Sequence, residues 1–150
     1  MKIAHIINSL NRGGAESHLL ELVTAQVDSE ISVDVIVIGS DSPNIFSIKS
    51  ELSNVCREIH RLKGPRMFNI FSYFKLQKII KNNSYDIIHS HQPRSDYMIY
   101  LIKKLIFPKN SFKWIVSVHG KYDSYLDENY QKIFKLYFFK KLVKSWNIAD

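Results

Sequence analysis

Short apolar runs alternate with segments of helical periodicity along this chain of 150 residues, and this alternation limits the folds open to it. The apolar runs are brief and rich in Ile and Val, which is typical of buried strands. Strands are expected over residues 2–8, 33–39, 55–62, 85–91 and 113–120, and helices over residues 15–27, 44–53, 68–82, 95–106 and 128–145. This order predicts an α/β fold in which helices cover both faces of a parallel sheet.

A single domain covering residues 1–150 is expected, because a chain of this length can bury its own core. No apolar run approaches the roughly 20 residues that span a bilayer, and the apolar start "MKIAHII" is too short for a signal peptide. Cys56 is the single cysteine, which excludes an internal disulfide framework and fits a reducing compartment. We therefore expect a cytoplasmic protein.

The net charge of +7 is unevenly distributed along the chain. Residues 1–60 carry four Lys/Arg against eight Asp/Glu, whereas residues 61–150 carry seventeen against six. A solvated basic surface would account for this excess. Attraction to an anionic partner is the alternative, and charge alone does not choose among nucleic acid, anionic lipid and a phosphorylated substrate.

Two adjacent glycines, Gly13 and Gly14, separate the first expected strand from the first expected helix. In an open α/β sheet, ligands bind beyond the carboxyl ends of the strands, where this loop lies. Glycine permits positive φ and a close approach of ligand to backbone, and the N-terminus of the following helix suits a phosphate. A phosphate-binding loop and a plain tight turn both fit this pattern, and the glycines by themselves do not decide between them.

Polar residues also follow the fourth and fifth expected strands. The fourth ends with His89, His91 and Arg94, and the fifth with His119 and Tyr122. Because the carboxyl ends of parallel strands meet at one edge, these groups are expected to share a crevice with the glycine loop. Side chains alternate along a strand, so the two histidines of the fourth strand point the same way. We expect His91 in the crevice and His89 beneath it as support.

A metal site is not expected at the two histidines of the fourth strand. No Asp, Glu or Cys that could complete a ligand set is evident beside His89 and His91. His5 and His60 are interpreted as structural histidines that hydrogen-bond to backbone carbonyl groups.

A nicotinamide-binding domain is a minor alternative. Its G-x-G-x-x-G fingerprint is absent, because no third glycine follows Gly14 in the helix. Asp41, beyond the second expected strand, is the residue that could bind a ribose in that reading.

The chain resembles the N-terminal domain of family-four (group 1) glycosyltransferases of the GT-B fold in three segments, "MKIAHIINSLNRGGAESHLLELV", "DIIHSHQPRSDY" and "IVSVHG". The resemblance covers essentially the whole chain. It implies two Rossmann-like domains that face each other across a cleft, the N-terminal one binding the acceptor and the C-terminal one most of the nucleotide-sugar donor. It further implies sugar transfer with retention of configuration and with no bound metal or other cofactor, the nucleotide-sugar being a substrate.

The resemblance also implies roles for individual residues. It places His119 near the donor sugar, where the ring stabilises charge as the phosphate leaves. Glu16 is expected to cap the first turn of its helix, where the helix dipole favours a carboxylate. The implied donor contacts are Gly13 and Gly14, and the implied acceptor contacts are His91, Arg94 and Tyr122.

Acceptors in such enzymes are glycans or lipid-linked molecules. Residues 61–81 carry six Lys/Arg, no acid and several aromatic residues, which suits an anionic membrane surface at the inner face of the membrane. Packing against the sheet is nevertheless expected for most of these aromatic residues. Nucleic acid is not expected as a partner, because no recognised binding motif accompanies the charge.

The last residues, Ala149 and Asp150, directly follow an expected helix, where the alternation predicts another strand. By the resemblance, the C-terminal donor domain is absent from this chain, which alone is expected to be inactive. We expect either a piece of a longer enzyme or one half of a split enzyme. In the second case the chain is a non-catalytic half that recruits an acceptor or a membrane to a separate donor-binding subunit.

Overall fold

A computed structural model describes residues 1–62, 70–105 and 111–119, and the structural statements below concern those residues. Strands and helices alternate as the sequence predicts. They run in the order β1 (Lys2–Ile7), α1 (Gly14–Asp28), β2 (Ser32–Val37), α2 (Lys49–Val55), β3 (Glu58–Arg61), α3 (Ile70–Asn83), β4 (Ile87–Ser90), α4 (Pro93–Leu105) and β5 (Lys113–Val116). The expected helix over residues 128–145 lies outside the described residues.

The strands form one parallel sheet in the order β3-β2-β1-β4-β5, which confirms the predicted α/β architecture. At the centre, Ile6 of β1 lies between Ile36 of β2 and Ser90 of β4. The chain moves outward from β1 through β2 to β3, and then crosses to β4 on the other side of β1. The carboxyl ends of β1 and β4 therefore flank the point where strand order reverses, which is the usual ligand site of such sheets.

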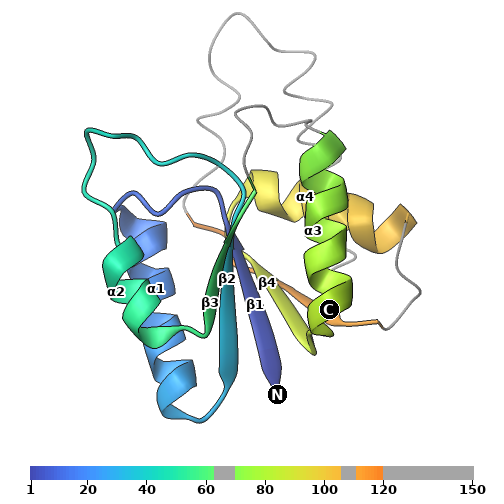
Figure 1. Ribbon diagram of the computed structural model, residues 1–150, viewed down its shortest axis with the longest axis horizontal. Coiled ribbons are helices and arrows are strands. Elements are labelled where there is room, and N and C mark those ends of the chain that lie inside the picture. Colours follow the sequence, from blue (N-terminus) through green and yellow to red (C-terminus); the bar gives the residue numbers. More distant parts are fainter. Residues whose placement is uncertain (63–69, 106–110, 120–150) are drawn as a thin grey trace, which may run out of the picture.

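Two helical layers enclose the sheet, with α1 and α2 on one face and α3 and α4 on the other (Figure 1). The alternation of side chains along β2 divides the core accordingly. Val33, Val35 and Val37 pack in a cluster with residues of α1 and α2. Ile36 and Ile38 pack in a second cluster with residues of α3 and α4. Burial of both faces explains why β1 and β2 are largely apolar.

The helix expected over residues 44–53 begins later, at Lys49. The preceding backbone hydrogen-bonds the loop after β1: Arg12 N–H donates to the Phe46 carbonyl at 2.7 Å, and Ile48 N–H donates to the Leu10 carbonyl at 2.9 Å. Tertiary hydrogen bonds thus take the groups that a helix would have used, so the weak local signal was wrong for residues 44–48.

The strands expected over residues 85–91 and 113–120 are shorter, ending at Ser90 and Val116. Backbone hydrogen bonds continue one residue further, from His91 N–H to the Ile6 carbonyl at 3.1 Å and from Ser117 N–H to the Ser90 carbonyl at 2.9 Å. Next comes α4, whose first residue is Pro93; its fixed φ and missing N–H suit that position. The residues directly after β4 and β5 are consequently tethered to the neighbouring strands at the sheet edge.

Candidate functional site

The glycine loop leads from β1 into α1 at the carboxyl edge of the sheet. Gly13 is the residue before α1 and has extended dihedrals, φ −150° and ψ −177°. Neither Gly13 nor Gly14 uses a positive φ, so that part of the expectation was wrong. What Gly13 provides is space, because a Cβ there would lie 2.7 Å from the Oε2 of Glu16. A Cβ at Gly14 would have no neighbour within 4 Å, so the backbone there faces open space.

The carboxylate of Glu16 fills the space beside Gly13. Glu16 is 7% exposed although it is an acid in the first turn of α1, where the helix dipole favours it. Its Oε1 accepts a hydrogen bond from Gln92 Nε2 at 3.2 Å, and Gln92 Oε1 accepts one from Asn8 N–H at 2.9 Å. The acid thus lies in the first turn of α1 as expected, and the N-cap residue Gly13 makes no side-chain capping bond. Gln92 instead joins the starts of α1 and α4 to the end of β1.

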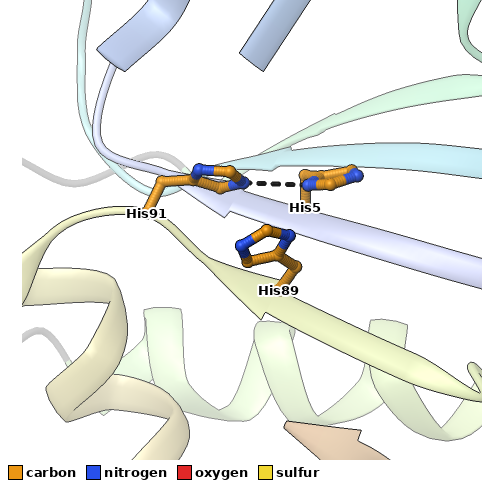
Figure 2. A group of neighbouring side chains, drawn as sticks. All are labelled: His5, His89 and His91. Atoms are coloured by element: carbon orange, nitrogen blue, oxygen red, sulfur yellow. Dashed lines mark hydrogen bonds between the residues drawn. The ribbon is translucent and has the colours of Figure 1, made fainter. Parts of the chain in front are cut away.

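Five histidines from β1, α1, β4, β5 and their loops gather at this edge. His5, His89 and His91 lie together, as Figure 2 shows, with the rings of His89 and His91 stacked at 4.2 Å between centroids. The stacking confirms that these two side chains point the same way. Ring centroids of His91 and His119 are 5.5 Å apart, and those of His119 and His18 are 5.3 Å apart. A row of imidazoles therefore runs from the exposed His18 into the sheet.

A chain of hydrogen bonds connects the inner members of this row. Gln26 Oε1 lies 2.7 Å from His5 Nε2, and His5 Nδ1 lies 2.9 Å from His91 Nε2 (Figure 2). Because the amide oxygen of Gln26 only accepts, His5 carries its proton on Nε2 and accepts at Nδ1. His91 then carries its proton on Nε2, and its Nδ1 lone pair points to His119 Nε2, 3.3 Å away. The protein thereby sets the tautomer of His91.

Burial keeps the inner imidazoles neutral. Desolvation lowers the pKa of His5 to about 4 and that of His89 to about 3, in each case with a contribution from a neighbouring histidine. Desolvation also lowers the pKa of His91 and, less strongly, that of His119, while the Glu16 carboxylate opposes the shift at His119. Near pH 7 these rings are neutral and each offers one nitrogen lone pair.

The structure corrects several expectations for the individual histidines. His91 is fully buried behind His119 and does not line an open crevice. His89 bonds to Ser117 Oγ at 2.7 Å. His5 bonds to the side chains of Gln26 and His91, and the His60 ring lies 3.1 Å from the carboxylate of Glu58. Within the described part of the chain, neither histidine pairs with the expected backbone carbonyl group.

Arg94 lies in the first turn of α4, near the same edge. Its Nη1 would be 3.5 Å from a Cβ at Gly39, which follows β2, and burial lowers the pKa of its guanidinium. Asp41 accepts from Leu10 N–H at 2.7 Å and from Arg61 at 2.7 Å. Burial alone would raise the pKa of Asp41, but these bonds hold it below its usual range. Both of its oxygens are thus engaged within the protein. Tyr122 lies outside the described residues.

Sequence reasoning missed three members of this site: His18, Gln26 and Gln92. Each lies within or just before a helix, where nothing in the local pattern distinguishes it from a solvated polar residue. The argument against a metal also rested on the lack of a third ligand beside His89 and His91. Among the residues that the structure describes, the fold supplies further histidines instead. Two triplets have all their ligand atoms within 4.8 Å of one another: His5, His89 and His91, and His18, His91 and His119.

A family model matches the chain by sequence, and a solved structure shares its fold. The sequence model of the family described as Glycosyltransferase Family 4 matches residues 12–150. Sucrose-phosphate synthase from Thermosynechococcus elongatus has a similar fold, with a TM-score of 0.62 and 16% sequence identity. The match covers 94% of this chain but 39% of that structure, so the chain spans well under half of its length. No curated protein sequence matches the chain.

Proposed function

The chain belongs to glycosyltransferase family 4, and from that premise we propose that it is the acceptor-side half of a sugar-transferring enzyme. The fold is that of one half of a GT-B glycosyltransferase. The donor is a nucleotide-sugar and the acceptor a glycan or lipid-linked molecule. Transfer proceeds with retention and needs no bound cofactor.

One observation supports this proposal most: the glycine loop after β1 and His119 after β5 lie at the same edge of the sheet. The backbone at Gly14 is open, and the first N–H groups of α1 are directed there with the positive end of the helix dipole. His119 is partly exposed and neutral, and it rests on the buried His91. A donor phosphate between the two would meet helix N–H groups on one side and an imidazole on the other.

Other expected contacts fit this arrangement to different degrees. Because His91 is fully buried, its proposed role is to support His119. Direct contact of His91 with the acceptor would require the loops to move. Arg94 and Tyr122 are the proposed acceptor contacts. A second, donor-binding domain, in the same polypeptide or in a separate subunit, forms the other wall of the cleft. Holding both substrates in register accounts for roughly 7–11 kcal/mol of a barrier, so this chain alone does not complete the transfer.

Matched substitutions at the two glycines test the donor site. Gly14→Ala is expected to leave the melting temperature unchanged or slightly raised, because the methyl enters open space at a helical position. The same methyl would obstruct a phosphate at that backbone. The apparent affinity for a nucleotide-sugar, measured from the amide shifts at residues 12–17, should therefore fall at least tenfold.

Gly13→Ala is the control: it should lower the stability and leave the affinity for the nucleotide-sugar unchanged. Its methyl would displace the carboxylate of Glu16 and break the bond to Gln92, at a cost of about 1 kcal/mol in the free energy of unfolding. If a nucleotide-sugar shifts amides elsewhere but not at residues 12–17, or if Gly14→Ala leaves its affinity unchanged, the donor site lies elsewhere.

Exposed apolar residues at the start of α3 favour a membrane-borne acceptor. Phe71 is 78% exposed and Phe74 is 61% exposed, which corrects the expectation that the aromatic residues here mostly pack inward. Tyr73 does pack against the core. Lys75 and Lys78 are exposed on the same helix. No described helix is long and apolar enough to cross a membrane. We therefore propose peripheral contact with an anionic cytoplasmic membrane surface, which would also serve a non-catalytic recruiting half.

Vesicle sedimentation tests this contact. The variant Phe71→Ser/Phe74→Ser should bind vesicles containing phosphatidylglycerol at least tenfold more weakly, because each buried Phe contributes about 1.5–3 kcal/mol. Phe46→Ser is the matched control, since Phe46 is 71% exposed but belongs to the loop before α2 and not to α3. Figure 1 shows α2 and α3 on opposite faces of the sheet. Equal losses in the two variants, or binding that is insensitive to the anionic lipid, would argue against α3 as the membrane contact.

A further inference from the structure

We propose that His18, His91 and His119 form a binding site for a divalent transition-metal ion of the Zn²⁺ type. The three imidazoles come from α1, from the residue after β4 and from the loop after β5, and their ligand atoms all lie within 4.8 Å of one another. His18 is exposed, His119 is partly buried and His91 is buried, so an ion can enter from solvent and reach the innermost ligand.

The spacing of the inner two ligands fits metal coordination. Zn–N bonds of about 2.0–2.1 Å at a tetrahedral angle put two ligand nitrogens about 3.3–3.4 Å apart. His91 Nδ1 and His119 Nε2 are 3.3 Å apart, whereas the ordinary hydrogen bond between His5 and His91 spans 2.9 Å. An ion could therefore replace the longer contact with little movement of either ring.

The groups behind His91 prepare it as a ligand. Its Nε2–H donates to His5 Nδ1 (Figure 2), and the Nε2–H of His5 donates to Gln26 Oε1. This leaves the Nδ1 lone pair of His91 aimed at the proposed ion. Histidines that bind metals usually donate their other ring N–H in this way, which fixes the tautomer and raises the basicity of the ligand.

The inner triplet of His5, His89 and His91 does not meet these conditions. His5 and His91 have no exposed surface, and their facing nitrogens already form a short hydrogen bond. An ion there would have to break the bonds to Gln26 or Ser117 in a region closed to water. The outer triplet keeps those bonds intact.

Three protein ligands leave a fourth coordination position for water, which is typical of an open site. The carboxylate of Glu16 lies close enough to influence the charge on His119 and would favour a bound cation. This ion is not a cofactor for the proposed transfer. It would occupy Nε2 of His119, so a bound ion and a substrate would compete for that nitrogen.

Titration of the chain with Co²⁺ and with Zn²⁺, each alone, tests the site. We expect one equivalent of Co²⁺ to give the visible absorption of tetrahedral coordination without a thiolate charge-transfer band, and Zn²⁺ to displace it. His18→Ala should weaken binding at least tenfold, and because His18 is exposed on α1 the variant should keep its melting temperature. His60→Gln and Cys56→Ala remove a histidine and the single thiol outside the site, and should leave the affinity unchanged.

A substitution at Gln26, which hydrogen-bonds to His5 behind the proposed ligands, provides a second test. Gln26→Leu touches no proposed ligand atom but removes the acceptor that sets the tautomers, so it should weaken Zn²⁺ binding by about 10–100-fold. Absence of a one-to-one complex would overturn the proposal. Binding that survives His18→Ala unchanged, or that is lost in His60→Gln or Cys56→Ala, would overturn it as well.

Discussion

Replacing His119 by alanine in the complete glycosyltransferase is expected to lower kcat by roughly 10²–10³-fold, the usual loss when one preorganised group that stabilises transition-state charge is removed. The side chain lies at the edge where the helix N-terminus of α1 and the end of β5 meet. It is only partly buried and contacts His91 from the solvent side, so the melting temperature should change little.

The comparison with His60→Gln separates a catalytic loss from a general one. His60 lies on β3, an edge strand of the sheet, and its ring contacts the carboxylate of Glu58. Its substitution should leave both kcat and KM unchanged. For His119→Ala, a loss confined to KM would indicate uniform substrate binding instead of transition-state stabilisation. A kcat that is unchanged, or that falls only in proportion to the unfolded fraction, would contradict the role.

The sheet and its helices were predictable because the signals that define them are local. β2 is apolar on both faces except at Asp34, since both faces are covered, and α1 shows Leu19 and Val23 at helical spacing. Boundaries shifted where tertiary hydrogen bonds took over, as at Ile48, whose N–H bonds to Leu10. The carboxyl-edge position of the glycines and of His119 followed from topology alone, since parallel strands end at one edge.

The composition of the site was less predictable, because it depends on contacts between distant segments. His5 and His91 are 86 positions apart and share a hydrogen bond, and Gln26 reaches His5 from the far half of α1. Nothing in either local sequence signals this. The reason for a glycine at position 13 could not be predicted either. Gly13 leaves space for the side chain of Glu16 and does not adopt a special backbone conformation. Side-chain packing, which the sequence encodes only collectively, decided each of these points.

A buried carboxylate on β2 leads to the largest expected effect on stability. Replacing Arg57 by alanine should lower the free energy of unfolding by about 3–5 kcal/mol, the cost of removing one partner from a buried ion pair. Arg57 Nε donates to Asp34 Oδ1 at 2.8 Å, and its Nη2 donates to Oδ2. The Asp34 side chain has no exposed surface, whereas that of Arg57 is 42% exposed. The substitution therefore leaves the anion, and not the cation, without compensation inside the fold.

The remaining contacts of Asp34 replace little of what Arg57 supplies. The Tyr85 hydroxyl donates to Asp34 Oδ2, and burial together with this bond raises the pKa of Tyr85, so it stays a neutral donor. His60 Nε2 is 3.7 Å from the same oxygen, beyond hydrogen-bond reach. One neutral donor does not offset a buried negative charge.

Arg12→Ala is the matched control, because Arg12 also pairs two ways with a carboxylate, that of Glu51, but in an exposed setting at 46% and 39% exposure. Its loss should cost less than about 1 kcal/mol. Arg57→Lys should fall between the wild type and Arg57→Ala, since lysine keeps the charge but not the paired N–H geometry. Urea denaturation of the three variants measures the differences. Equal losses of unfolding free energy for Arg57→Ala and Arg12→Ala would mean that burial of Asp34 does not govern the strength of the Arg57–Asp34 pair. The fold would then tolerate an unpaired carboxylate on β2.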